Sequence, residues 1–211
     1  MFRRKKGDAD DVEPTEVEVE TPPGPRARGP WDVSEVDLED GVERVDLGSL
    51  LITPPTGLDL QLQVDQTSGQ LVAVILAGET GAVELRAFAA PRHGDVWDDV
   101  RRRVAAEIAA MGGTATEVEG AWGTEVNVSL TVTRDDGQRV QQASKVIGVP
   151  GPRWLLRATL FGRPAVEHLE DGDVERALRD VVVVRGNTPV PPGDPLPLTM
   201  PPNAQRIGPG A

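Results

Sequence analysis

The chain has 211 residues, of which 34 are Asp or Glu and 22 are Lys or Arg, so its formal net charge is −12. It has no cysteine, which excludes disulfides, thiolate metal sites and a cysteine nucleophile, and which is typical of a protein from a reducing cytoplasm. The acidic balance argues against nucleic-acid binding, and the longest apolar run, residues 71–77, is far shorter than the roughly 20 residues that span a bilayer. We therefore predict an acidic, cytoplasmic protein without an integral membrane segment.

The N-terminal residues 1–30 differ in composition from the rest of the chain. A basic cluster at residues 3–6 is followed by an acidic stretch and then by prolines, and not by the apolar stretch of a secretory signal. Too few apolar side chains are present to offset the entropy of ordering. We expect a disordered tail here, then a single domain over residues 31–186.

Alternating apolar and polar residues predict strands in the first half of this domain. Residues 58–64 and 83–87 alternate, which places one face on a core and the other in water. Residues 71–77 are almost wholly apolar, as in a strand covered on both faces. Residues 48–52 are a further candidate strand.

Residues 96–111 are predicted to form a helix. Apolar residues recur there at helical spacing, Asp95 is a candidate N-cap, and two glycines follow the last apolar position. Trp97 falls beside the apolar stripe and is expected in the core.

Strand patterns resume in the second half. Residues 126–132 alternate, residues 135–137 (Asp-Asp-Gly) are typical of a hairpin turn, and residues 138–149 and 154–161 continue as strands. A last helix is expected from a cap at Asp171 or Asp173 through Val181 to Gly186. This order of strands, helix, strands and helix favours an α+β fold: an antiparallel sheet of about six to eight strands with two main helices packed against one face.

The C-terminal residues 187–211 are rich in proline but also contain Leu196, Leu198 and Met200. Proline favours extended polyproline II conformation, while these side chains offer apolar surface to bury. The segment either packs along its own domain or serves as a ligand for a groove on another protein.

Two tryptophans and two arginines form a candidate ligand site. Trp154 stands at the start of a predicted strand between Arg153 and Arg157, and glycines flank Trp122. One interpretation is that the arginines recognise an anionic group beside the indole rings. The other is that the arginines pair with local carboxylates while both tryptophans pack in the core.

We predict no catalytic residue, cofactor or metal. His93 with Asp95 could serve as a general base, but it is also what a loop before a helix contains. His93 and His168 are far apart in a chain without thiols, which is a poor zinc set. The acidic run over residues 32–46 lacks the central glycine and the terminal glutamate of a calcium loop and is expected to be solvated.

Several short runs carry a family resemblance. Residues 29–32, 46–50, 87–92, 184–186 and 196–198, together with Gly-Pro-Arg-Trp at residues 151–154, resemble an uncharacterised actinobacterial family that is defined only as a domain of unknown function. The resemblance covers residues 29–201 and implies no activity or catalytic residue. The order of elements is similar to that of Mog1/PsbP-like domains, which is an analogy of fold alone.

Three functions remain open on the sequence. The first is a non-catalytic binding or adaptor protein that captures an unidentified protein partner through its tails. The second is a small-molecule domain that binds an anionic ligand through Arg153, Trp154 and Arg157. The third is an enzyme that uses His93 and Asp95, which is disfavoured because only one such pair is present.

Overall fold

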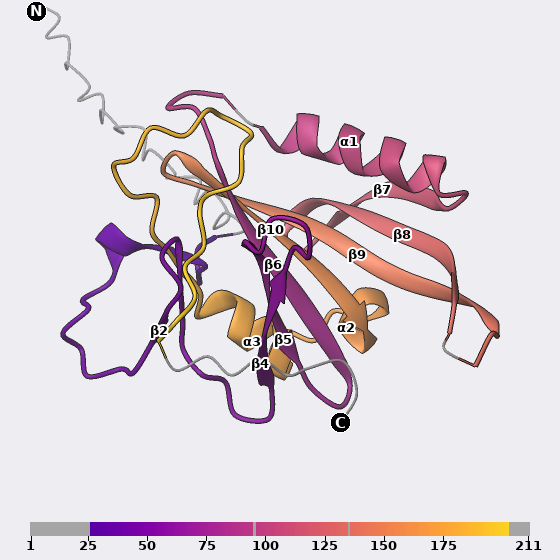
Figure 1. The fold of residues 1–211 in the computed structure, drawn as a ribbon, viewed down its shortest axis with the longest axis horizontal. Helices are drawn as coiled ribbons and strands as arrows, with labels where there is room; N and C mark the ends of the chain where they lie inside the picture. Colours follow the sequence, from indigo (N-terminus) through magenta and orange to yellow (C-terminus); the bar gives the residue numbers. More distant parts are fainter. Residues whose placement is uncertain (1–25, 95, 135, 203–211) are drawn as a thin grey trace, which may run out of the picture.

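Seven antiparallel strands form the main sheet of the computed structural model, which describes residues 26–94, 96–134 and 136–202. The strand order is β4-β5-β6-β10-β9-β8-β7 (Figure 1). The bounds are β4 Asp59–Val64, β5 Leu71–Ala77, β6 Gly81–Ala89, β7 Thr114–Gly120, β8 Gly123–Thr133, β9 Arg139–Gly151 and β10 Trp154–Gly162. The predicted antiparallel sheet of six to eight strands is confirmed. The sequence did not predict the strand β7, because its residues show no regular alternation of apolar and polar side chains.

Two meanders make up this sheet. Strands β4 to β6 pair in chain order, as do β7 to β10, and the antiparallel pairing of β6 with β10 joins the two halves. In this central pairing Leu85 lies opposite Ala158, and both are fully buried. The middle of the sheet therefore depends on residues that are distant in the sequence.

Helix α1, Trp97–Ala110, covers one face of the main sheet (Figure 1). Its buried residues Trp97, Val100 and Val104 pack in a cluster that includes Val126 of β8 and Leu155 of β10. The predicted helix and the burial of Trp97 are confirmed. The predicted cap, Asp95, lies outside the described residues.

The opposite face carries the main core. Helices α2, Arg163–Val166, and α3, Asp173–Arg179, pack there with a small sheet of order β1-β11-β3-β2. Leu155 belongs to the α1 cluster and Leu156 to the main core, and successive strand residues point to opposite faces. The expectation that the two main helices cover the same face of the sheet is therefore wrong. An apolar stripe shows that one side of a helix is buried, but it does not show which face of the sheet the helix packs against. The strands of the small sheet are β1 Trp31–Asp32, β2 Val45–Asp46, β3 Leu50–Ile52 and β11 Val182–Val183, and a 3-10 turn, η1, spans Val33–Glu35.

The last helix is shorter than predicted. It ends at Arg179, and β11 then pairs in parallel with β1 and antiparallel with β3. Residues 181–184 are four consecutive valines, whose branched Cβ atoms favour a strand over a helix.

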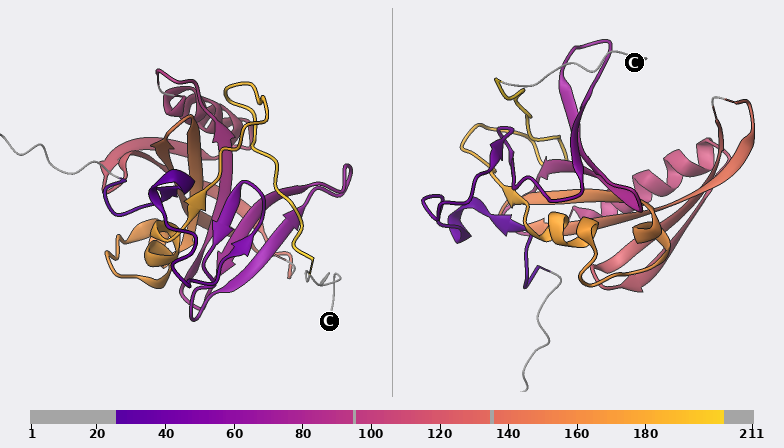
Figure 2. Two further views of the ribbon diagram at one scale, coloured as in Figure 1. Left: turned by 90° about the vertical axis from the view of Figure 1, so that its left-hand side faces the viewer. Right: turned by 90° about the horizontal axis from the view of Figure 1, so that it is seen from below.

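Residues 187–202, which we call the C-terminal strap, run along the outside of the domain (yellow in Figures 1 and 2). Leu196 is buried in the main core, and its N–H donates to the carbonyl of Ala87 at 2.8 Å. Further along, the Thr199 N–H donates to the carbonyl of Leu47 at 2.9 Å. Strand β5 pairs with β6 only as far as Leu85, so the strap occupies the part of the β6 edge that β5 leaves open. Of the two alternatives for this segment, the described part packs on its own domain.

Candidate functional site

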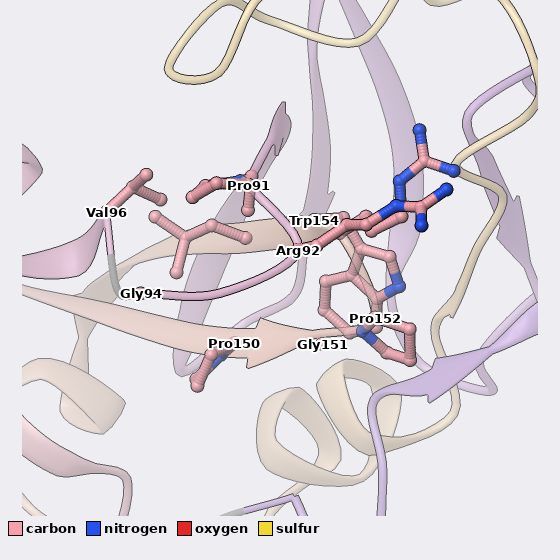
Figure 3. Close-up of a pocket in the computed structure, with 11 residues that line it drawn as sticks. Pro91, Arg92, Gly94, Val96, Pro150, Gly151, Pro152 and Trp154 are labelled. Atoms are coloured by element: carbon pink, nitrogen blue, oxygen red, sulfur yellow. The ribbon is translucent and has the colours of Figure 1, made fainter.

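A pocket of about 320 Å³ lies between the β9–β10 hairpin and the loop that leads from β6 to α1. Its walls are residues 150–155 of the hairpin and residues 90–92, 94 and 96 of the loop. Figure 3 shows the loop crossing the hairpin, with Val96 at one end of the pocket and with Arg92, Pro152 and Trp154 at the other. Most of the lining side chains are apolar, and several are prolines, so the walls are rigid.

The hairpin turn that forms one wall holds an arginine in an unusual conformation. Gly151 pairs with Trp154, which leaves Pro152 and Arg153 as the two turn residues. Arg153 has φ +62° and is the only non-glycine residue in the described ranges with positive φ. Glycine is the residue expected at the second position of a turn with this geometry. A side chain in the left-handed region costs roughly 1–2 kcal/mol, so the turn carries this side chain at a cost to stability.

The backbone of this turn is held on two sides. The carbonyl of Arg153 accepts from the Ala90 N–H at 2.9 Å and from Nε of Arg185 at 3.1 Å. A Cβ on Gly151 would lie 2.1 Å from the ring of Trp154, so only glycine allows the indole to pack against the hairpin. Contacts on two sides therefore fix the backbone from which the Arg153 side chain projects.

Positive charge gathers at the end of the pocket near the turn. Arg92 and Arg153 are exposed, and neither has an ion pair with any described residue. Arg185, which holds the turn, donates only to carbonyl oxygens within the described chain, those of Arg153, Thr188 and Val190. Three guanidinium groups thus stand here without a carboxylate partner among the described residues, in a protein whose net charge is −12.

Trp154 forms the floor of this end of the pocket. The residue is fully buried, and its indole N–H donates to Oδ2 of Asp32 at 2.7 Å. Arg26 stacks over the ring at 5.7 Å and also pairs with Glu35, which lowers the pKa of the Glu35 carboxyl mainly through the hydrogen bond between them. Trp154 is therefore part of the pocket wall, but its ring has no exposed face on which a ligand could stack.

Asp32 is a neighbour of the pocket residue Trp154 that the sequence did not reveal. It was expected in a solvated acidic segment, but it is only 6% exposed and accepts from both the backbone N–H and the hydroxyl of Ser34 as well as from Trp154. That part of the expectation is wrong. Nothing in the local pattern separates this carboxylate from its exposed neighbours, because its partner is 122 positions away.

The other two predicted ligand residues lie apart from the pocket. Trp122 is buried in the main core, where Arg179 stacks over its ring at 5.3 Å. Arg157 stands on the face covered by α1, with its guanidinium 5.5 Å from the ring of Phe88. The structure thus brings Arg153 and Trp154 together and adds Arg92, which the sequence did not single out as a ligand residue. A role in binding for any of them stays a prediction.

The residues considered for chemistry are described only in part. His93 is exposed on the loop beside the pocket, and Asp95 lies outside the described ranges. No group of three or more potential metal ligands occurs among the described residues. In the same part of the chain, no helix is long and apolar enough to cross a membrane.

A family model described as Protein of unknown function (DUF3710) matches residues 29–206. The chain belongs to the DUF3710 family. The region shared with DUF3710 includes both walls of the pocket and the whole C-terminal strap. A search of the curated proteins finds no match. Membership of a family defined as a domain of unknown function is confirmed, while the Gly-Pro-Arg-Trp signature, the actinobacterial origin and the likeness to Mog1/PsbP domains stay predictions.

Proposed function

We propose that this domain is a binding protein whose pocket takes a small amphipathic anion, with an apolar body against the prolines and a carboxylate or phosphate group at the arginines. The observation that carries the proposal is Arg153. An exposed arginine without a partner among the described residues occupies a turn position that glycine would fill at lower cost. Costly backbone conformations persist where the surrounding structure requires them, and they are concentrated at ligand sites.

The composition of the pocket supports the same class of ligand. Its volume of about 320 Å³ is at the lower end of the range for small-molecule sites, which are mostly apolar with a few polar groups that fix orientation. Arg92 and Arg153 supply planar donors that match the geometry of a carboxylate or phosphate. We therefore expect the charged end of the ligand near the turn and its apolar end toward Val96.

Calorimetric titration with phenyl phosphate tests the proposal, with benzyl alcohol as the uncharged control. The decisive variant is Arg153→Gly, which removes the guanidinium but suits the positive φ of the turn. Hydrogen bonds to charged groups contribute about 1.5–3 kcal/mol, so its affinity should fall at least tenfold. Arg102→Gln is the matched control, because Arg102 is exposed on α1 and pairs with Asp99. Equal affinity of wild type and Arg153→Gly for phenyl phosphate, or no preference over benzyl alcohol, contradicts the proposal.

An adaptor role through the tails is a separate prediction that a pull-down tests. Residues 187–202 lie against the domain, so a partner that needs this segment must displace it. The comparison of full-length protein with the segment 26–202 identifies partners that are bound through residues 1–25 or 203–211. A partner lost from the shorter protein supports the adaptor role, and identical partners for both count against it.

A further inference from the structure

Two arginines face each other across the central strand pairing. Arg157 of β10 lies directly opposite Arg86 of β6, and both project from the face that carries Leu155 and α1. Side chains in such positions have Cβ atoms about 4.5–5.5 Å apart, and like charges there are destabilising. The pairing register therefore forces two guanidinium groups together in the middle of the sheet.

The described structure supplies one carboxylate in contact with this pair. Oε1 of Glu84 accepts from Nε of Arg86 at 2.8 Å and lies 3.7 Å from Nη2 of Arg157. The Nε of Arg157 is buried and has no hydrogen-bond partner in the described chain. Burial, and then repulsion from Arg86, lower the pKa of Arg157. One shared carboxylate leaves the pair with excess positive charge and an unused donor.

A third arginine approaches from α1. Arg103 is close enough to Arg157 to repel its charge, and Glu107 one turn further along is close enough to attract it. Nη2 of Arg103 also lies 3.6 Å from where a Cβ on Gly193 of the C-terminal strap would stand. Arg103 therefore lies beside the strap, and electrostatic range alone connects it to the opposed pair of Arg86 and Arg157. Their side chains remain open to a small ion, since Arg86 and Arg157 are 30% and 20% exposed.

We propose that Arg86 and Arg157, with Arg103 of α1 nearby, form a binding site for a phosphate group. A guanidinium presents paired N–H donors that match two phosphate oxygens, so a phosphate group can use the donors of both arginines that Glu84 leaves free. Phe88, packed against Arg157, excludes water from one side and strengthens the interaction. The site is separate from the pocket at the hairpin and does not rest on the function proposed for that pocket.

The apo protein itself provides a first test through Arg86→Gln. This variant leaves Glu84 to pair one-to-one with Arg157 and removes the repulsion across the strands. In sodium chloride its melting temperature should equal or exceed that of wild type. A clear loss of stability in chloride shows that both arginines serve a structural ion network around Glu84, which overturns the proposal.

Titration with inorganic phosphate at constant ionic strength provides the second test. Wild type should bind phosphate and melt at a higher temperature than in chloride, and Arg86→Gln should bind at least tenfold more weakly. Arg157→Lys, which keeps the charge but loses the paired donors, is the second variant should Arg86→Gln fail to fold, and it should also weaken binding. Arg176→Gln is the matched control and should keep wild-type phosphate affinity, because Arg176 is exposed on α3 and pairs with Asp173. Indistinguishable behaviour of wild type in phosphate and chloride, or affinities of wild type and both site variants within twofold, overturns the proposal.

Discussion

The buried pair of Asp32 and Trp154 allows a sharp stability prediction. Replacing Asp32 by alanine leaves the indole N–H of a fully buried tryptophan without its acceptor. An unsatisfied buried donor costs about 1–3 kcal/mol. The same change removes the cap of the short η1 turn, in which Asp32 accepts from Ser34, and a lost cap costs about 1 kcal/mol. The sum is about 3 kcal/mol, or roughly 6–12 °C in melting temperature for a chain of this size.

Urea denaturation followed by tryptophan fluorescence measures this loss, with Asp37→Ala as the matched control. Asp37 is an exposed carboxylate of the same segment that accepts only from the backbone N–H of Glu39 in the described chain, so its removal should cost less than about 0.5 kcal/mol. A double-mutant cycle with Trp154→Phe isolates the pair, since the two losses should be less than additive by about 1–3 kcal/mol. Equal effects of Asp32→Ala and Asp37→Ala, or a coupling near zero, would refute this reasoning.

Two further predictions concern the strap and the pH dependence of stability. Leu196→Ala should lower the free energy of unfolding by about 2–4 kcal/mol in urea denaturation, because Leu196 is 4% exposed within the main core. Met200→Ala is the control and should change the free energy of unfolding little, because Met200 is 41% exposed. Similar values for both variants would show that the strap contributes no core packing. Burial raises the pKa of Asp180, so its ionised form is disfavoured in the folded state and costs stability above the folded pKa. Asp180→Asn should therefore be more stable than wild type at pH 7. This gain in stability should disappear as the pH falls through the pKa of Asp180 in the folded protein toward its value in the unfolded chain, near 3.8. A gain that is independent of pH would contradict the raised pKa of Asp180.

Local patterns were sufficient for the long elements of the fold. Alternation marks β4 and β8, and apolar residues at helical spacing mark α1. Strand β7 was not predicted, because it lies at the edge of the sheet and most of its side chains are exposed. A strand in this position does not need alternating apolar and polar residues. The two-residue strands of the small sheet are too short to carry a period, and they are defined by their partners.

The candidate site was predictable only in part, for a related reason. Arg153 and Trp154 could be singled out from the sequence, because a tryptophan between two arginines at the start of a predicted strand is a local pattern. Arg157 lies three residues beyond Trp154 on β10, and its neighbour Arg86 is set by the register with β6. Asp32 could not be recognised because its buried position depends on a contact with Trp154, 122 residues further along the chain.

The pairing of β6 with β10 has a consequence for how the protein folds. The hairpins within each meander close over short stretches of chain, and such events take microseconds. The central pairing closes a much longer loop, whose entropy must be lost before its contacts contribute. Domains dominated by distant strand pairings fold over milliseconds to seconds, so we expect the docking of the two meanders to limit the folding rate. Until that step the facing edges of β6 and β10 are open to pairing with other chains, and aggregation during refolding should therefore increase with protein concentration.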